Sequence, residues 1–313
     1  MKYTDRREAL LKDKIIDQTM NEDLATFWNE QVAALRAIPI SFTREKLELP
    51  YEKAFTTYRV CFNTHDDTVV EALFSVPAGH EGEKLPCVAR FHGGGGKKRI
   101  YPDTVATGVC CFAMDVRSQG GTTVDKAHYE LGDTMGSLMS RDCTNRNSFY
   151  MKNIYLDAVR AMDVIAMMPE VDSSRIVTFG QSQGGALSIV ASAFSGHSQK
   201  CYVSEPSYSC LHKRLELGSG VFGAANDFLR RYPDYTDAVL DTLTYFDINN
   251  IASLLTVPTD FCLALADPVC LPEFVYSAYA HINAEKKIHF YPFVPHYTPD
   301  EYDLLVHREF SEL

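Results

Sequence analysis

The sequence predicts an α/β protein with a mostly parallel central sheet and helices on both faces. Short apolar segments with strand character alternate with longer segments of helical periodicity, as in parallel sheets covered by helices. A turn with a serine at its centre, Gly180-Gln181-Ser182-Gln183-Gly184, stands between one of these strands and the next helix. No internal repeat or linker interrupts the chain, so we expect residues 1–313 to form one α/β domain with an N-terminal helical extension.

The individual elements follow from the spacing of apolar residues. Residues 21–37 carry apolar side chains at helical spacing and give the first expected helix. Strand character follows over residues 52–64, 68–79, 86–91, 109–116, 174–180, 259–266 and 287–294, and further helices are expected over 184–194 and 273–284. In such sheets the ligand site lies beyond the carboxyl ends of the strands, so functional residues should directly follow strands.

Composition narrows the class of partner and the compartment. The formal net charge of −11 argues against a nucleic-acid backbone as ligand, because phosphates require a basic face. The nine cysteines are an odd number without a CxxC pair, which favours buried thiols in a reducing compartment. The charged N-terminal segment lacks the apolar core of a signal peptide, and no apolar run approaches the roughly 20 residues of a membrane span. We therefore expect a cytoplasmic protein that binds neither nucleic acid nor membrane.

The turn around Ser182 fits the G-x-S-x-G pattern of a nucleophile elbow, which is typical of the α/β-hydrolase fold. The serine of such an elbow sits on a strained turn, so its neighbours must be small, and Gly184 and Gly185 let the following helix approach the strand. The alternatives are an incidental serine in a glycine-rich turn, a dinucleotide fingerprint and a P-loop. The fingerprint G-x-G-x-x-G is absent, and Gly96-Lys97 is followed by lysine rather than serine or threonine.

A second glycine-rich segment, His92–Gly96, directly follows the expected strand 86–91. Hydrolases of this fold take one oxyanion donor from the amide after the nucleophile, here Gln183, and the second from a loop of this kind. We assign the second donor to Gly94. The alternative is a merely flexible loop, which the later elbow disfavours.

Asp267 is the candidate acid of a catalytic triad, because the order on this fold is serine, acid, histidine. It directly follows the strand 259–266. Asp247 lies in a polar stretch before that strand, and Asp260 lies at its start, on the wrong edge of the sheet. A surface aspartate before a proline is the competing interpretation of Asp267.

His296 is the candidate general base, because it comes just after the last expected strand. His281 falls within a helix, His289 alternates along the strand, and His307 lies in the terminal helix. In the predicted triad His296 takes the Ser182 proton and later protonates the leaving alcohol, while Asp267 holds the imidazole tautomer.

With these residues in place, the sequence resembles the acetyl xylan esterase / cephalosporin C deacetylase family, carbohydrate esterase family seven. The resemblance covers nearly the whole chain, including residues 155–185 and 265–280, and Arg117-Ser118-Gln119 is similar to the family's Arg-Gly-Gln motif. It implies deacetylation of small acetylated sugars such as xylo-oligosaccharides, and of cephalosporin-type acetates, without a metal or other cofactor. It also implies a homo-oligomer, commonly a hexamer, in which Arg117 and Gln119 support the site without reacting.

Three positions depart from the family pattern. Ser118 replaces the glycine of Arg-Gly-Gln, Gly94 stands where the family has a tyrosine after His-Gly, and Tyr297 replaces the glutamate of the His-Glu motif. An aromatic wall of the acyl pocket is therefore expected to be missing. A small-acyl esterase of broader specificity, a peptidase or acyltransferase with the same triad, and a non-catalytic scaffold remain the alternatives. The segment Ser204–Tyr208 follows a further strand and is a candidate for the acyl pocket.

Overall fold

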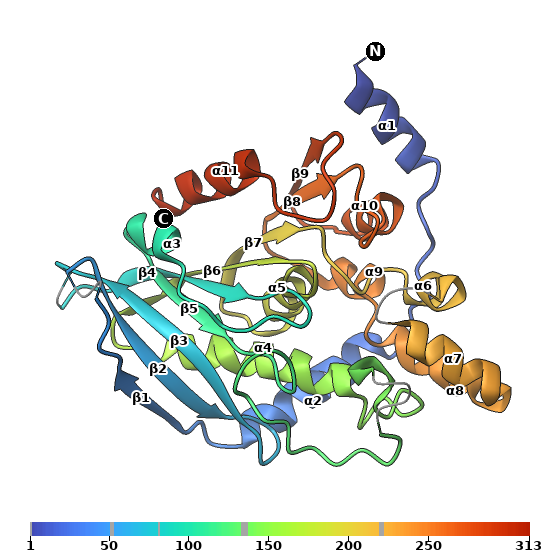
Figure 1. The fold of residues 1–313 in the computed structure, drawn as a ribbon, viewed down its shortest axis with the longest axis horizontal. Coiled ribbons are helices and arrows are strands. Elements are labelled where there is room, and N and C mark those ends of the chain that lie inside the picture. The colour runs from blue at the N-terminus through green and yellow to red at the C-terminus, as the bar shows by residue number, and fades with distance from the viewer. Residues whose placement is uncertain (1, 51–52, 81, 133–136, 219–221) are drawn as a thin grey trace.

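The computed structural model describes residues 2–50, 53–80, 82–132, 137–218 and 222–313. Within these ranges the chain forms a nine-stranded sheet with the strand order β1-β2-β3-β5-β4-β6-β7-β8-β9 (Figure 1). The strands are β1 (Phe42–Lys46), β2 (Phe55–Asn63), β3 (Val69–Pro77), β4 (Leu85–Phe91), β5 (Cys110–Met114), β6 (Val171–Gln181), β7 (Ser198–Ser204), β8 (Thr259–Ala264) and β9 (Lys286–Tyr291).

Helices connect and cover these strands. The α-helices are α1 (Tyr3–Lys12), α2 (Leu24–Ala37), α3 (Pro102–Ala106), α4 (Tyr150–Ala166), α5 (Gln183–Phe194), α6 (Leu211–Leu217), α7 (Gly223–Arg231), α8 (Thr236–Thr244), α9 (Ile248–Ile251), α10 (Pro272–Ala280) and α11 (Asp300–Phe310). Short 3₁₀ turns are η1 (Leu138–Ser140), η3 (Pro233–Tyr235) and η4 (Ala252–Leu254). None of the helices in the described ranges combines the length and hydrophobicity that crossing a bilayer requires.

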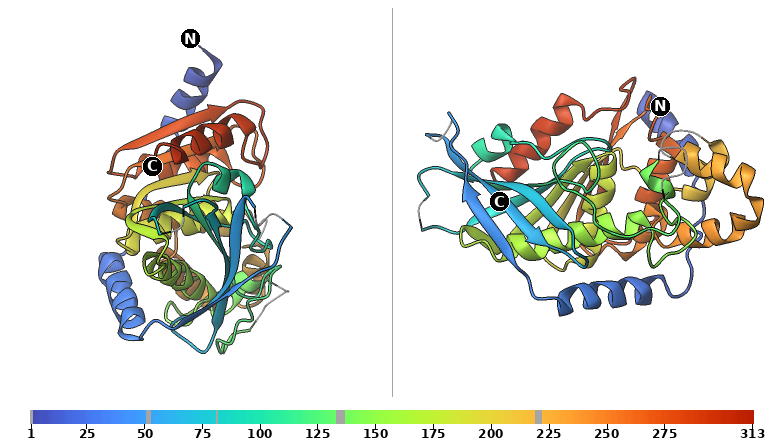
Figure 2. Two further views of the ribbon diagram at one scale, coloured as in Figure 1. Left: turned by 90° about the vertical axis from the view of Figure 1, so that its left-hand side faces the viewer. Right: turned by 60° about the horizontal axis from the view of Figure 1, so that its bottom comes forward.

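The sheet is parallel from β5 to β9 and antiparallel from β1 to β5. Parallel strands need crossovers, and helices supply them, so the predicted alternation of strands and helices is confirmed. The antiparallel strands form one edge of the sheet, and Figure 2 shows them at the side of the molecule opposite α7 and α8.

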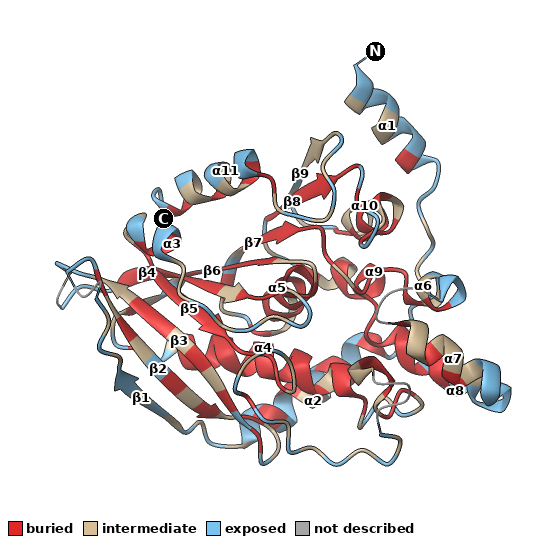
Figure 3. Ribbon diagram, viewed as in Figure 1, coloured by how far each residue is buried: buried red, intermediate tan, exposed pale blue. Residues whose placement is uncertain are grey.

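Side chains of one strand alternate between two hydrophobic cores. Cys87 and Ala89 of β4 belong to the large core under α2, α4 and α5, whereas Val88 between them packs in a second core with Val306 and Phe310 of α11. This alternation follows from the two-residue repeat of a strand. Helices therefore cover both faces, as the sequence predicts, and burial is greatest in α4, α5 and the central strands (Figure 3).

Candidate active site

The turn between β6 and α5 holds Ser182 in a strained conformation. Its φ of 56° and ψ of −122° lie in a region that L-residues rarely adopt. A Cβ atom at Gly180 would overlap the backbone of Gly184, and one at Gly184 would overlap the carbonyl oxygen of Phe91. The glycines are therefore required by the close approach of β6, α5 and β4, and the serine stands at the carboxyl end of the central strand.

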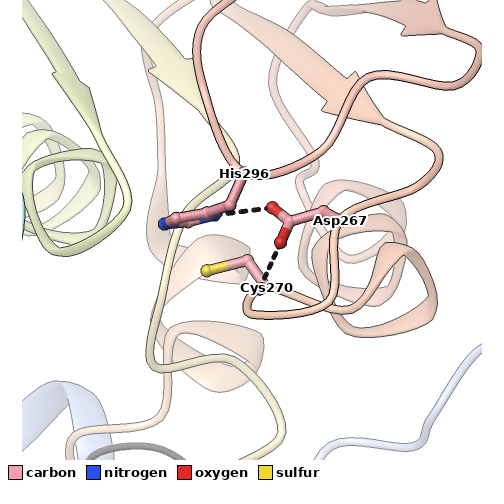
Figure 4. Close-up of side chains that lie close together, drawn as sticks. All are labelled: Asp267, Cys270 and His296. Atoms are coloured by element: carbon pink, nitrogen blue, oxygen red, sulfur yellow. Dashed lines mark hydrogen bonds and ion pairs between the residues drawn. The ribbon is translucent and has the colours of Figure 1, made fainter.

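Asp267 and His296 follow β8 and β9, and the structure brings their side chains together. His296 Nδ1 donates to Asp267 Oδ2 over 2.7 Å (Figure 4). Asp267 is buried, and its Oδ1 accepts hydrogen bonds from the amides of Val269 and Cys270 at 2.7 and 2.9 Å. Burial lowers the pKa of His296, but the hydrogen bond to Asp267 and the adjacent Cys270 outweigh it and raise that pKa above its ordinary value.

The Ser182 hydroxyl makes its hydrogen bond with Ser207, at 2.9 Å between the two Oγ atoms. Ser207 Oγ in turn lies 3.2 Å from Cys270 Sγ. The thiol of Cys270 lies beside the imidazole of His296, and one potential ligand atom each of Cys270, His296 and Asp267 falls within 4.8 Å of the others (Figure 4). Ser207 and Cys270 thus form a series of contacts from the Ser182 hydroxyl to the Asp267–His296 pair.

The glycine-rich loop after β4 is fixed by a buried neutral histidine. Nδ1 of His92 donates to the Gly93 carbonyl at 2.8 Å, and Nε2 accepts from the Val116 amide at 3.0 Å. Burial lowers the pKa of His92, so the imidazole stays uncharged near neutral pH. The ring therefore holds the loop against the end of β5.

Two backbone amides, one in this loop and one at the turn around Ser182, are available to donate a hydrogen bond to a ligand. Gly95 N–H donates to Gln119 Oε1 at 2.9 Å, and Gly96 N–H donates to Gly93 O at 3.0 Å. Between described residues, no such bond involves the Gly94 amide. The Gln183 amide is the first of α5, where helix N–H groups have no intrahelical acceptor. These are the two amides that the sequence singles out as oxyanion donors.

Gln119 joins the loop to the elbow. Its Nε2 donates to Gln183 Oε1 at 2.8 Å, and Gln183 Nε2 donates back to Gln119 Oε1 at 3.0 Å. The hydroxyl of Tyr208 also donates to Gln183 Oε1, at 2.8 Å, and the hydroxyl of Tyr150 accepts from Gln119 Nε2 at 3.3 Å. Gln119 thus contacts both elements that carry the candidate donors.

Arg117 lies fully buried two residues earlier and anchors this segment. Its guanidinium binds both oxygens of Asp157 at 2.7 Å and reaches Asp66 at 2.7 Å and Asp125 at 3.1 Å. Its carbonyl oxygen accepts from the Tyr150 hydroxyl at 2.6 Å. A buried cation is stable only when it is paired in this way, so the carboxylates hold the chain that positions Gln119.

Three side chains near Ser182 had no place in the predicted triad or oxyanion hole, although two of them lie in the segment Ser204–Tyr208 that the sequence offered as a candidate for the acyl pocket. Ser207 and Glu205 lie in the segment after β7, and Cys270 lies three residues after Asp267. The segment wraps the elbow, because Ser182 N–H donates to Ser204 O and Ser207 N–H donates to Ser182 O, both at 3.0 Å. Burial raises the pKa of Glu205 to about 7, although the hydroxyl of Ser204 donates to it. For Glu205 and Ser207 the only signal in the sequence was the position of their segment after a strand.

The rival aspartates and histidines have structural partners elsewhere. Asp247 caps α9 by accepting from Asn249 N–H at 2.8 Å. Asp260 lies 3.1 Å from His289. His281 and His307 bond the carbonyl oxygens of Ile16 and Asp303, respectively. These contacts therefore tie the rival residues to parts of the fold other than the turn around Ser182.

The side chains of Asp267, Cys270 and His296 are of metal-ligating types. Both oxygens of Asp267 already accept hydrogen bonds, one of them from His296 Nδ1 itself. Asp267 holds His296 through Nδ1 as the acid of a triad holds its base, so the cluster fits an acid–base pair better than a cation site.

The fold and the strained serine at a strand-to-helix turn define this protein as an α/β-hydrolase. The sequence profile of the acetyl xylan esterase family matches residues 1–309. The chain therefore belongs to the acetyl xylan esterase family, whose members are carboxylic ester hydrolases.

Individual relatives agree with this assignment. The acetyl esterase Axe7A of Xylanibacter ruminicola is 25% identical over 287 residues, which are 90% of this chain, while the chain spans 64% of that relative's length. The structure of an acetyl xylan esterase from Paenibacillus sp. R4 matches 100% of this chain and 99% of its own with a TM-score of 0.91 and 27% identity. Acetyl xylan esterase 1 from a Thermoanaerobacterium species matches 100% and 98% with a TM-score of 0.86 and 25% identity.

Proposed function

We propose that this protein is a serine carboxylesterase that removes acetyl groups from small acetylated sugars, among them xylo-oligosaccharides, through an acyl-enzyme on Ser182. The observation that carries the proposal is the 2.7 Å hydrogen bond between His296 and the buried Asp267, both of which follow neighbouring strands at the edge of the sheet that carries Ser182. Names of the relatives support the acetyl group and the sugar.

In the proposed reaction the Ser182 hydroxyl turns from Ser207 to Nε2 of His296, which takes its proton as the oxygen attacks the acetyl carbonyl. The amides of Gly94 and Gln183 donate to the oxyanion. His296 then gives the proton to the leaving alcohol, and Asp267 stabilises the imidazolium in between. Water deacylates Ser182 by the same route and releases acetate.

Ester and amide substrates test this proposal. We expect p-nitrophenyl acetate and acetylated xylobiose to be hydrolysed, a peptide anilide to remain intact, and Ser182→Ala to lose the activity. Brief reaction with the acetate ester should add one acetyl group to the wild-type protein, which intact-mass spectrometry detects, and none to Ser182→Ala. Turnover of the anilide at a comparable rate would indicate a peptidase instead, and no turnover of any ester would indicate a scaffold.

The compartment, the assembly and the wider substrate range are part of the proposal. We expect a cytoplasmic homo-oligomer that also accepts cephalosporin-type acetates. All nine cysteines, each within the described ranges, are free thiols, and eight of them are buried, as suits a reducing compartment. Light scattering on the full chain measures the assembly, and release of acetate from cephalosporin C measures the range. A monomer would contradict the first expectation, and an intact acetate the second.

A further inference from the structure

A cavity of about 520 Å³ lies beside α7, where the turn η3 meets the loop that leads into α4. Figure 1 shows α7 and α8 at the end of the molecule next to this loop, and α7 contacts η1. Aromatic rings of Phe228, Tyr232 and Tyr235 line the cavity together with polar side chains of the loop. Its volume is of the size that holds a small ligand.

Two of these rings are exposed to solvent. Tyr232 is 55% exposed and Tyr235 is 49% exposed, while Phe228 beneath them is buried. Their ring centroids lie 5.3 and 5.5 Å from that of Phe228. The two tyrosine rings are tilted against that of Phe228, at interplanar angles of 42° and 44°, and present apolar surfaces to the cavity on which a flat apolar ligand face can pack.

The polar side of the cavity offers hydrogen-bond acceptors. Asp142 is 3% exposed, its Oδ1 accepts from the Leu131 amide, and its Oδ2 is buried without a hydrogen-bond partner. Its backbone has a φ of 52°, in the left-handed region. Asp142 therefore contributes negative charge to the wall of the cavity, while the exposed acceptors lie on its neighbours.

The charge of the cavity selects among ligands. Its lining includes the carboxylates of Glu130 and Asp142 and no lysine, arginine or histidine from the described part of the chain. Anions are therefore repelled, whereas hydroxyl groups find acceptors in Glu130, Asn145 and Ser148. The lining thus combines apolar aromatic faces with hydrogen-bond acceptors. A neutral sugar ring matches it, because such a ring has apolar C–H faces and hydroxyl donors at its edge.

The cavity is connected to the candidate active site through few residues. Ser148 at the cavity stands two residues before Tyr150. The Tyr150 hydroxyl accepts from Gln119, which also accepts from the amide of Gly95 in the oxyanion loop. A series of hydrogen bonds thus runs from Tyr150, two residues after Ser148 of the cavity, to the glycine-rich loop after β4.

We propose that this cavity is a binding subsite for unacetylated sugar units of the oligosaccharide whose acetyl group reaches Ser182. The inference rests on the proposed function and adds to it the place where the glycan chain binds. Tyr232 and Tyr235 supply ring faces to the sugar, and the loop between Asp142 and Ser148 supplies acceptors to its hydroxyls.

The test compares kcat/KM for acetylated xylotriose with kcat/KM for p-nitrophenyl acetate, which has no sugar rings. We expect the ratio to fall about tenfold in Tyr232→Ala and in Tyr235→Ala, with KM for the oligosaccharide carrying the change, since tenfold corresponds to one well-placed contact. Tyr232→Phe keeps the ring and should keep the ratio. Tyr3→Ala is the matched control, because Tyr3 is 40% exposed and stacks on Phe293 away from the cavity.

Calorimetric titration of the wild-type protein with xylotriose gives a readout apart from activity, and its affinity should fall in Tyr232→Ala but not in Tyr3→Ala. A ratio and an affinity that stay at the wild-type values in both alanine variants would overturn the subsite. An altered assembly with an unchanged ratio would also overturn it and mark the rings as an interface. Failure of the proposed function gives a different result from failure of the subsite, because the wild-type protein would then hydrolyse neither ester.

Discussion

The hydroxyl of Ser182 lies 2.9 Å from that of Ser207 and makes its hydrogen bond there, while Nδ1 of His296 is hydrogen-bonded to Asp267. In the described conformation Asp267 and His296 are paired, and the Ser182 hydroxyl is hydrogen-bonded to Ser207. Catalytic hydrogen bonds are often made only when substrate binds, so under the proposed mechanism this arrangement is that of the free protein.

Ser207→Ala tests how strongly the hydrogen bond between Ser182 and Ser207 slows acylation. Removing it should raise the rate of acylation up to about fivefold, because one hydrogen bond contributes roughly 1 kcal/mol net to the resting state. The burst of p-nitrophenol from p-nitrophenyl acetate measures that rate. A fall of more than tenfold would instead place Ser207 among the residues that stabilise the transition state.

The pH profile of kcat/KM should reveal the environment of His296. The base must be neutral to accept a proton, and its pKa is raised above 6.5 because the hydrogen bond to Asp267 and the adjacent Cys270 outweigh burial. The acidic limb is therefore expected above pH 6.5, and Asp267→Asn should move it to lower pH as well as slow the reaction. A wild-type limb at or below pH 6.5 would contradict this.

The raised pKa of His296 also makes the stability of the fold depend on pH. A group whose pKa is raised on folding stabilises the fold fully below its unfolded value, about 6.5, and loses that contribution as pH rises through the folded value. The difference in Tm between wild type and Asp267→Asn should therefore shrink as pH increases above 6.5. A difference that grows with pH over that range would count against the pairing.

Gly94→Tyr should narrow the acyl pocket without harming the fold. A Cβ at Gly94 would meet only Gln183 Oε1, at 4.0 Å, and the backbone is outside the left-handed region. We expect the ratio of acetate to butyrate turnover to rise about tenfold, the scale of discrimination by a hydrophobic pocket, with Tm nearly unchanged. Gly95→Tyr is the control, because a φ of 71° there makes any side chain costly and should lower Tm. An unchanged ratio in Gly94→Tyr would show that this position does not face the acyl group.

Ser118→Gly should stabilise the protein. Ser118 has a φ of 56°, where glycine is favoured by about 1 kcal/mol, and the cost of the change is a 3.3 Å hydrogen bond from Arg141. Thermal unfolding should show a Tm higher by a few degrees. Ser311→Gly, at a φ of −71°, provides the comparison and should bring no gain. A lower Tm in Ser118→Gly would mean that the side chain contributes more than the backbone strain costs.

The parallel strands of the sheet could be predicted well from the sequence, because buried strands appear there as short apolar runs. The same runs indicated the edge of the sheet at which the candidate site lies. It gave no signal for β1, whose five residues FTREK are mostly polar and are held by pairing with β2. Helix α4 was missed for a related reason. Its buried face carries Asp157 and Asp163, whose partners Arg117 and Arg36 lie far away in the chain.

The sequence also could not show which side chains lie next to Ser182 in space. Ser207 stands 25 residues from Ser182, and Cys270 stands 63 residues from Ser207. Neither belongs to a motif whose chemistry demands it. Their contacts arise because β6, β7 and β8 are neighbours in a parallel sheet, which brings the segments after these strands to one edge.

The central claim is that His296, and no other histidine, is the general base. The protein offers its own control, because His289 lies 3.1 Å from Asp260 in a second Asp–His pair. On p-nitrophenyl acetate we predict that His296→Gln lowers kcat/KM on the order of 10⁴-fold, whereas His289→Gln stays within about tenfold of wild type. Equal losses in the two variants, or a His296→Gln protein that keeps a tenth of the wild-type value, would contradict the account.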